Sequence, residues 1–285
     1  MSYPHHGAPG LFVVSLLLTM FTAFVYLRGW LDLRATSSKT IEAWRAGSFL
    51  LGLFLIWVAV ASPLAALDHE FLTVHMIQHL LLMTFAAPLI LLGEPMMLLW
   101  PEGLQGYKPR AERFVRHPGL EFTRENAPQR GARIIFCWLA ATAALVVWHI
   151  PAAFALGMRS HAWHLFEQAS FFTTGLLFWW PVVQPWPSGK LTDWSIILYL
   201  FLATLPCDIL SGFLVFSERV AYPVYLSTSD ESSLTVLADQ QCAGALMWTC
   251  VTIVYLVAAA ILSIRLLSPQ NSAATETDPQ SVSVL

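Results

Sequence analysis

Two histidines four residues apart, His75 and His79, lie in the apolar stretch HMIQHLLLM at residues 75–83. Four residues make just over one helical turn, so both imidazoles would leave one face of a helix, about 6 Å apart along its axis. Imidazole pairs of this kind bind zinc or copper, and imidazoles on separate helices bind haem iron. The motif lacks the glutamate of HExxH and therefore does not indicate a metalloprotease.

The same pair has an ordinary structural explanation. A histidine inside an apolar helix is often a packing group whose ring nitrogen bonds to a neighbouring carbonyl. An unpaired imidazole in hydrocarbon costs free energy, however, and one bound ligand would satisfy several imidazoles at once. The choice between the two depends on whether further polar residues converge on the pair.

The composition indicates which elements position these histidines. Of the 285 residues, 56% are hydrophobic and 12% are charged, whereas soluble proteins carry roughly 25% charged residues. A helix needs about 20 apolar residues to cross a bilayer core. We therefore predict an all-α, polytopic membrane protein built as a bundle of seven transmembrane helices. The predicted spans are Leu11–Leu27, Trp44–Leu64, Leu72–Leu92, Ile134–Phe154, Trp163–Val183, Trp194–Phe216 and Ala243–Leu267.

The basic residues predict the orientation. All but Arg159 and Arg219 of the fifteen Lys and Arg residues fall on one side of these spans. Basic loops stay in the cytoplasm, so the amino terminus is predicted outside and the carboxyl terminus inside. The chain then divides into an outer tail (residues 1–10), the transmembrane domain (11–267) and a disordered cytoplasmic tail (268–285).

This topology brings polar residues from four spans to one depth in the outer half of the bundle. The predicted metal ligands are His75, His79, His149, His164 and Asp239. The possible supporting residues are Gln240, Met247, Cys242, Gln168 and Asp208. Asp239 could instead cap the start of its own helix. Thioether and thiol groups near the imidazoles favour copper(I), which prefers soft ligands. No catalytic base stands out, so a non-enzymatic protein is expected.

Five motifs in one order carry a resemblance to a known family. They are ASPLAALDHEFLTVHMIQHLLLMTFAAPLILLGEP (61–95), WHIPAAF (148–154), HLFEQASFFTTGLLFWWPV (164–182), YPVY (222–225) and DQQCAGALMW (239–248). With them the chain resembles the CtaG family of caa3-type cytochrome c oxidase assembly factors, integral membrane proteins of bacteria. The resemblance implies a multi-pass protein of the cytoplasmic (inner) membrane that delivers or inserts copper during oxidase maturation. Two positions depart from the family pattern: Gln168 replaces a frequent histidine, and Cys242 replaces a bulkier apolar residue.

The leading hypothesis is an assembly factor, or metallochaperone, that binds copper in the outer half of the bundle and delivers it to a cytochrome c oxidase subunit. A periplasmic copper donor and membrane lipid are further expected partners, and no nucleic-acid partner is expected. Zinc or haem are the alternative ligands. Two other functions stay open: a haem-binding membrane cytochrome with axial histidines, and a metal-free helper of oxidase assembly.

Overall fold

The computed structural model describes residues 9–36, 42–95, 127–183, 194–227 and 235–267, and all secondary structure in these ranges is helical. The long helices are α1 (Pro9–Thr36), α2 (Ala43–Ala61), α7 (Ala127–His149), α9 (His161–Val183), α10 (Trp194–Phe216) and α11 (Val236–Leu267). The shorter ones are α3 (Leu72–His79), α4 (Ala87–Leu92) and α8 (Pro151–Arg159). Two 3₁₀ turns, η1 (Pro63–Leu67) and η4 (Pro223–Ser227), and a π-helical segment, η2 (Leu80–Ala86), complete them.

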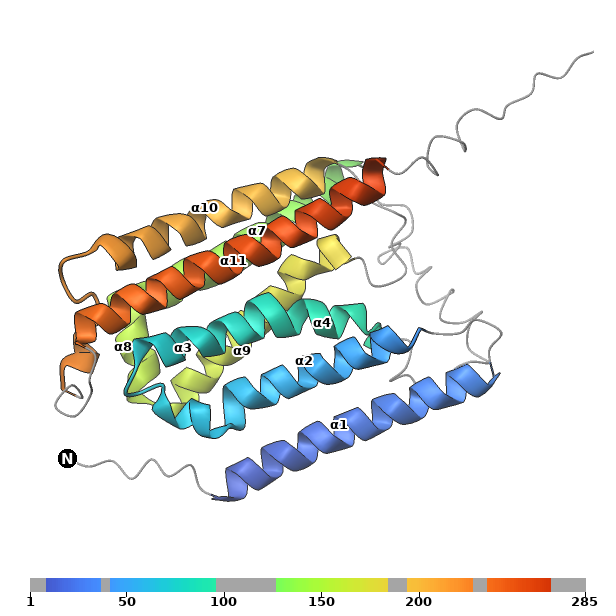
Figure 1. Ribbon diagram of the computed structural model, residues 1–285, viewed down its shortest axis with the longest axis horizontal. Helices are drawn as coiled ribbons and strands as arrows, with labels where there is room; N and C mark the ends of the chain where they lie inside the picture. Colours follow the sequence, from blue (N-terminus) through green and yellow to red (C-terminus); the bar gives the residue numbers. More distant parts are fainter. Residues whose placement is uncertain (1–8, 37–41, 96–126, 184–193, 228–234, 268–285) are drawn as a thin grey trace, which may run out of the picture.

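The long helices lie side by side and alternate in direction (Figure 1). The continuous rod formed by α3, η2 and α4 lies in the centre, between α2, α9 and α11. Of its most apolar stretch, 61% is buried inside the bundle, against 6% for the peripheral α1. The starts of α3, α9 and α11 and the end of α7 therefore meet at one end of the bundle, on the left in Figure 1.

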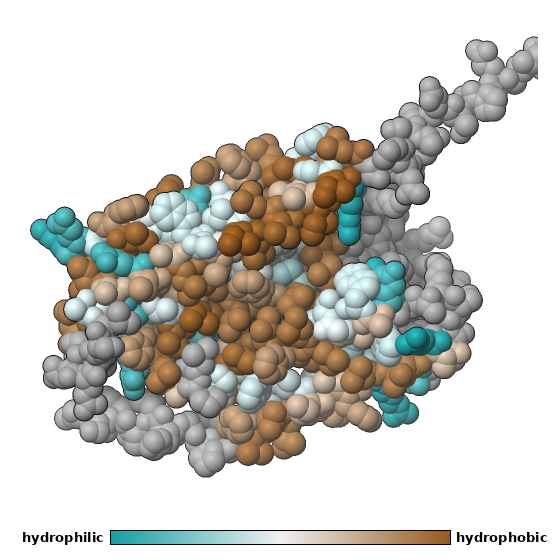
Figure 2. All heavy atoms as spheres, viewed as in Figure 1, coloured by the Kyte–Doolittle hydropathy of each residue, from teal (hydrophilic) through white to brown (hydrophobic). Residues whose placement is uncertain are grey.

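The surface is that of a membrane protein. Large apolar side chains such as Phe21, Ile209 and Leu256 are more than 60% exposed. Figure 2 shows apolar residues over the middle of one face and hydrophilic residues mostly toward its two ends. Exposed apolar area on this scale requires a lipid environment.

Six helical stretches in the described ranges are long and apolar enough to cross a membrane. They are Phe12–Asp32, Ala43–Leu67, Leu72–Leu92, Gly131–His149, Trp194–Phe216 and Val236–Leu267. The helix α9 has 23 residues, which is sufficient length, but its polar residues keep it outside this group. The all-α membrane class is thus confirmed, whereas the count of seven spans and the orientation stay predictions. Several features of the predicted topology lie outside the described residues. They are most of the basic loop at residues 108–133, Lys39, Lys190, the amino-terminal tail up to residue 8 and the tail from residue 268.

Proline changes two of the predicted spans. The span predicted at residues 134–154 is two helices, because Pro151 disfavours helical backbone at Ile150, which is extended with ψ 127°. As a result α7 ends at His149. Pro88 lies in the first turn of α4, and it cannot donate the hydrogen bond that a regular helix would require. The π-helical segment η2 directly precedes it; such segments are frequent at functional sites.

Candidate functional site

The two histidines of the opening motif lie one turn apart on the same face of α3. Both are buried, with exposed fractions of 0% for His75 and 6% for His79. Their Nε2 atoms are 2.8 Å apart, and the ring planes are close to perpendicular at 89°. The shared helix face expected from the spacing is therefore present, and both imidazoles direct the same ring nitrogen to one point.

A carboxylate from α9 completes this point. Oε1 of Glu167 lies 3.4 Å from Nε2 of His75 and 3.3 Å from Nε2 of His79. Glu167 is 1% exposed, and neither of its oxygens has a hydrogen-bond partner among the described residues. We refer to His75, His79 and Glu167 as the His–His–Glu cluster.

Gly157 of α8 leaves the space for this carboxylate. A Cβ atom at position 157 would lie 2.7 Å from Oε2 of Glu167, which is closer than real Cβ contacts allow. Any side chain larger than hydrogen there would displace the carboxylate. The position of Glu167 is thus determined by two elements, the helix α9 that carries it and the helix α8 that faces it.

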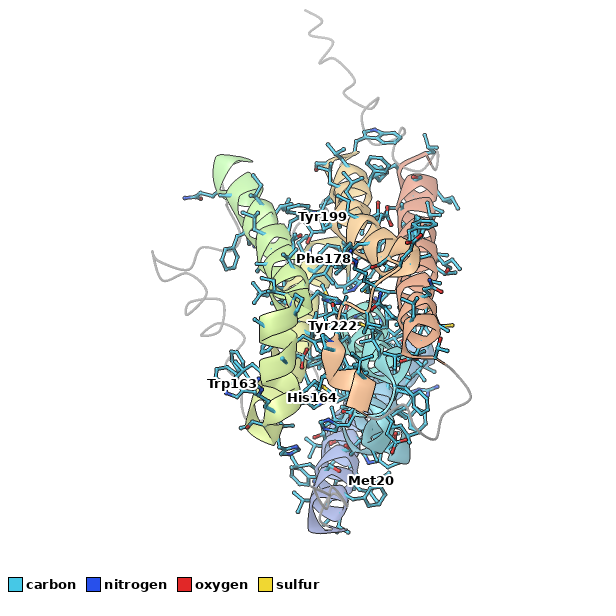
Figure 3. All side chains as sticks on the ribbon, turned by 90° about the vertical axis from the view of Figure 1, so that its left-hand side faces the viewer. Met20, Trp163, His164, Phe178, Tyr199 and Tyr222 are labelled. Atoms are coloured by element: carbon cyan, nitrogen blue, oxygen red, sulfur yellow. The ribbon has the colours of Figure 1, made fainter. Side chains whose placement is uncertain are left out.

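A second polar layer surrounds the cluster. Nε2 of His164 lies 3.0 Å from Asp68, and Nδ1 of His164 lies 3.4 Å from Oε2 of Glu167. The side-chain amide of Gln78 lies 3.4 Å from Asp68, and that of Gln168 lies 2.8 Å from Nε2 of His164. Figure 3 shows His164 directed into the bundle, while its neighbour Trp163 points outward. The ring of His164 therefore lies between two carboxylates and orients both.

Asp68 follows η1 at the end of the bundle, outside the spans, and is only 3% exposed. Burial by itself would raise the pKa of its carboxyl group, but the hydrogen bond and charge of His164 outweigh burial and hold the pKa below its usual value. The hydroxyl of Tyr225, in η4, donates a hydrogen bond to the backbone carbonyl of Asp68 at 2.8 Å. Asp68 is therefore held in place from both its side chain and its backbone, although it lies in a turn between helices.

His149 lies apart from the cluster but next to it. Its Nδ1 is 2.7 Å from the carbonyl of Leu145, and its Nε2 is buried without a hydrogen-bond partner among the described residues. The rings of His79 and His149 both contact Phe171, at centroid distances of 4.2 and 6.4 Å. A cavity of about 50 Å³ is lined by both histidines and by Met247, which is 4% exposed.

The structure places Asp239 and Gln240 elsewhere. The carboxylate of Asp239 accepts hydrogen bonds from the backbone N–H groups of Leu72 and Thr73, at 2.6 and 3.3 Å. Asp239 therefore caps the start of α3. The alternative drawn from the sequence was a cap on the start of its own helix, α11. Oε1 of Gln240 accepts a hydrogen bond from the N–H of Ala221 at 2.7 Å. These contacts assign both residues to positioning neighbouring segments.

The remaining supporting residues are also separate from the cluster. Cys242 is exposed on α11, so the predicted thiol ligand is not near the imidazoles. Asp208 is half-buried on α10, and its Oδ1 has no hydrogen-bond partner in the described part of the chain. Of the sulfur-containing residues predicted to support the site, only Met247 reaches the neighbourhood of the histidines.

Sequence reasoning missed Glu167, Asp68 and Gln78. Two signals could have found Glu167: it is an acidic residue inside a predicted span, and it stands three residues after His164, on the same helix face. Asp68 gives no such signal, because a carboxylate beside a helix end is ordinarily solvated.

The cluster has the dimensions of a cation site. Ligand atoms held about 2.0–2.2 Å from an ion lie about 3.3 Å apart in tetrahedral geometry, and the three distances here are 2.8, 3.3 and 3.4 Å. Asp68, His75 and His164 form a second close group. However, Asp68 and His164 already pair with each other, whereas the oxygens of Glu167 lack hydrogen bonds. The arrangement favours the His–His–Glu cluster as the place for an ion.

A family model described as "Cytochrome c oxidase caa3 assembly factor" matches residues 24–268. The match covers every element of the cluster and its second layer. No curated protein and no solved structure matches the chain.

Proposed function

The chain belongs to the family of cytochrome c oxidase caa3 assembly factors, and from this premise we propose that it binds a copper ion at the His–His–Glu cluster and delivers the ion to a subunit of the oxidase. Copper is the cargo in this proposal and not a permanent cofactor. The protein is multi-pass in the membrane; we further propose that this is the bacterial cytoplasmic membrane, with the cluster toward its outer side.

The observation that carries the proposal is the position of Glu167. A carboxylate buried among helices requires a partner, because an uncompensated charge in such surroundings costs several kcal/mol. The polar atoms nearest its Oε1 are the Nε2 atoms of His75 and His79, at 3.3–3.4 Å, and Nδ1 of His164 lies 3.4 Å from its Oε2. A cation between the three ligand atoms would compensate the carboxylate and satisfy both imidazoles.

The donor set narrows the choice of ion. Two imidazole nitrogens and one carboxylate oxygen suit copper(II) and zinc, whereas copper(I) prefers sulfur ligands. The cluster has no sulfur atom, so we propose copper(II) as the form that rests there. Haem does not fit, because a porphyrin plane must lie between two axial imidazoles, and Nε2 atoms 2.8 Å apart leave no room for it.

A non-enzymatic role agrees with the neighbouring side chains. Two histidines and a glutamate also hold catalytic zinc in metalloproteases, where a further glutamate serves as the base. Here the closest additional group is the imidazole of His164, whose Nδ1 lies 3.4 Å from Oε2 of Glu167 and whose Nε2 is engaged with Asp68 and Gln168. The amides of Gln78 and Gln168 cannot accept a proton at neutral pH. Asp68 is already paired with His164. The site is thus suited to hold an ion and not to activate water.

The test is metal analysis of the detergent-purified protein, loaded in parallel with copper(II), copper(I) and zinc. We expect one copper(II) per chain in the wild-type protein, and much less in His75→Ala and His79→Ala at similar protein levels. Ile77→Ala is the matched control, since Ile77 shares α3 and is only half-buried. Leu80, which directly follows His79, would not serve as a control, because it is 7% exposed and its truncation to alanine would open a cavity.

Three outcomes would contradict the proposal. Full copper content in both histidine variants would assign the imidazoles to packing. Haem bands in the visible spectrum would indicate a cytochrome instead. A wild-type protein that binds no metal while still supporting oxidase maturation would indicate a metal-free assembly helper.

A further inference from the structure

His149 has the features of a metal ligand that the His–His–Glu cluster does not use. Its Nδ1 faces the carbonyl of Leu145 at 2.7 Å, so the neutral ring carries its proton on Nδ1 and leaves Nε2 as a free electron pair. Metal-binding histidines are commonly fixed in this way by a backbone carbonyl. Nε2 is buried and has no partner among the described residues.

The small cavity beside the cluster is one of two hollows that His149 lines. Its volume is about 50 Å³, enough for a water molecule or an ion. It adjoins His79 of the cluster, and its walls include the sulfur-containing side chains of Met76, Met247 and Cys207. An ion that leaves His79 through this cavity would therefore meet soft donors and the free Nε2 of His149.

The second hollow is a groove between α7 and α10 that opens on the outer surface of the bundle. It measures about 900 Å³, and apart from His149 its lining is almost entirely apolar. In the described part of the chain, His149 alone lines both the cavity and the groove. The imidazole thus stands between the interior of the bundle and the lipid.

The size and lining of the groove indicate its occupant. It extends along residues 134–151 of the α7 side and 195–213 of α10, a length of about 27 Å at 1.5 Å per residue. This approaches the thickness of the hydrocarbon core, about 30 Å. A groove of that length fits one face of a membrane-spanning helix. Its apolar lining excludes a charged segment.

We propose that His149 is the exit ligand for copper, receiving the ion from His79 across the cavity and presenting it to a transmembrane helix of the acceptor oxidase subunit seated in the α7–α10 groove. This proposal rests on the function proposed above. The step is a ligand exchange: the bonds from the ion to Nε2 of His75, Oε1 of Glu167 and finally Nε2 of His79 break, and a bond to Nε2 of His149 forms. No electron or proton moves, because Nε2 of His149 is already unprotonated.

The experiment separates binding from transfer. Copper-loaded protein and copper-depleted oxidase are placed in the same liposomes, and the copper content of the oxidase is followed over time. His149→Asn keeps an N–H donor for the carbonyl of Leu145 but lacks Nε2. We expect it to hold wild-type copper and to transfer it at least tenfold more slowly, whereas His79→Ala should lose the copper itself.

A second pair of variants tests the occupant of the groove. Leu202 lines the groove, while its neighbour Phe201 is exposed and does not line it. Leu202→Trp should fill the groove and slow transfer with copper retained, and Phe201→Trp should behave as wild type. Normal transfer by Leu202→Trp would mean that the groove holds only lipid chains, and this would overturn the docking part of the proposal.

The outcomes distinguish the two proposals. A wild-type protein that binds no copper overturns the proposed function. If the wild type binds and transfers copper and His149→Asn transfers it at the same rate, only the proposed role of His149 is overturned. Loss of bound copper in His149→Asn would make His149 part of the binding site itself and would also overturn its role as exit ligand.

Discussion

Asp239, near the start of α11, accepts a hydrogen bond of 2.6 Å from the backbone N–H of Leu72, the first residue of α3. The two residues are 167 positions apart in the sequence. A carboxylate at this place satisfies N–H groups that the helix itself leaves unpaired. Because α3 carries His75 and His79 one and two turns further on, the cap also sets the depth of the His–His–Glu cluster.

Removing this cap should destabilise the bundle without removing a metal ligand. Asp239→Ala leaves the N–H groups of Leu72 and Thr73 unpaired, at a cost of about 1–3 kcal/mol. We expect a lower thermal unfolding temperature in detergent, with copper still bound at saturating concentration. Asp239→Asn should recover part of the loss, since it keeps one acceptor oxygen. Complete loss of copper in a folded Asp239→Asn protein would instead identify Asp239 as a ligand.

Glu167→Gln should be the most informative change at the site. The substitution keeps the shape of the side chain and removes the charge that a bound cation would balance. We expect the protein to accumulate normally and its copper affinity to fall by at least tenfold, by analogy with the loss of outer groups at metal sites. Equilibrium titration of the purified protein measures the change. Glu70→Gln is the control, since Glu70 is exposed; equal affinities in the two variants would remove Glu167 from the site.

Gly157→Ala tests the same carboxylate without changing any ligand. The new methyl group would lie 2.7 Å from Oε2 of Glu167 unless that side chain moves. The end of a glutamate side chain moves easily, so the expected effect is weakened copper binding with little loss of stability. Gly212→Ala is the matched control, because a Cβ there meets no atom within 4 Å. Unchanged copper affinity in Gly157→Ala would show that the ion does not depend on this position of the carboxylate.

The predicted orientation places the carboxyl terminus inside. A reporter that is active only in the cytoplasm, fused after Leu285, should therefore be active. The physical basis is the excess of Lys and Arg on that side, which the membrane insertion machinery retains in the cytoplasm. Activity of a periplasm-only reporter at the same position would contradict both the orientation and the odd number of spans.

The class of fold could be predicted from the sequence because length and hydropathy determine membrane helices almost alone. The resemblance to the oxidase assembly family is confirmed by the match over residues 24–268. The break between α7 and α8 could also have been expected, since Pro151 disfavours helical backbone at the preceding residue. It was missed because apolar residues continue across it to Phe154.

The site could be predicted only in part. The spacing of His75 and His79 on one helix is local and was correctly interpreted as a shared face. Their partners are not local: Glu167 belongs to α9, and Asp68 lies in a turn whose burial depends on Tyr225. Asp239 was assigned to the metal because it shares a depth with the histidines, and depth alone does not specify which side chain a carboxylate faces. Its contact with Leu72 depends on the packing of α11 against α3.

The polarity of α9 has a consequence for how the chain enters the membrane. Its first two turns hold His161, His164, Glu167 and Gln168, and each ionisable group raises the cost of partitioning a helix from the translocon into lipid. We therefore expect α9 to be retained beside the translocon until α3, with Asp68 and the imidazoles, is available to receive it. Biogenesis of the protein would then depend on the same polar contacts that form its site, and a variant such as Glu167→Gln should insert α9 more readily than the wild type.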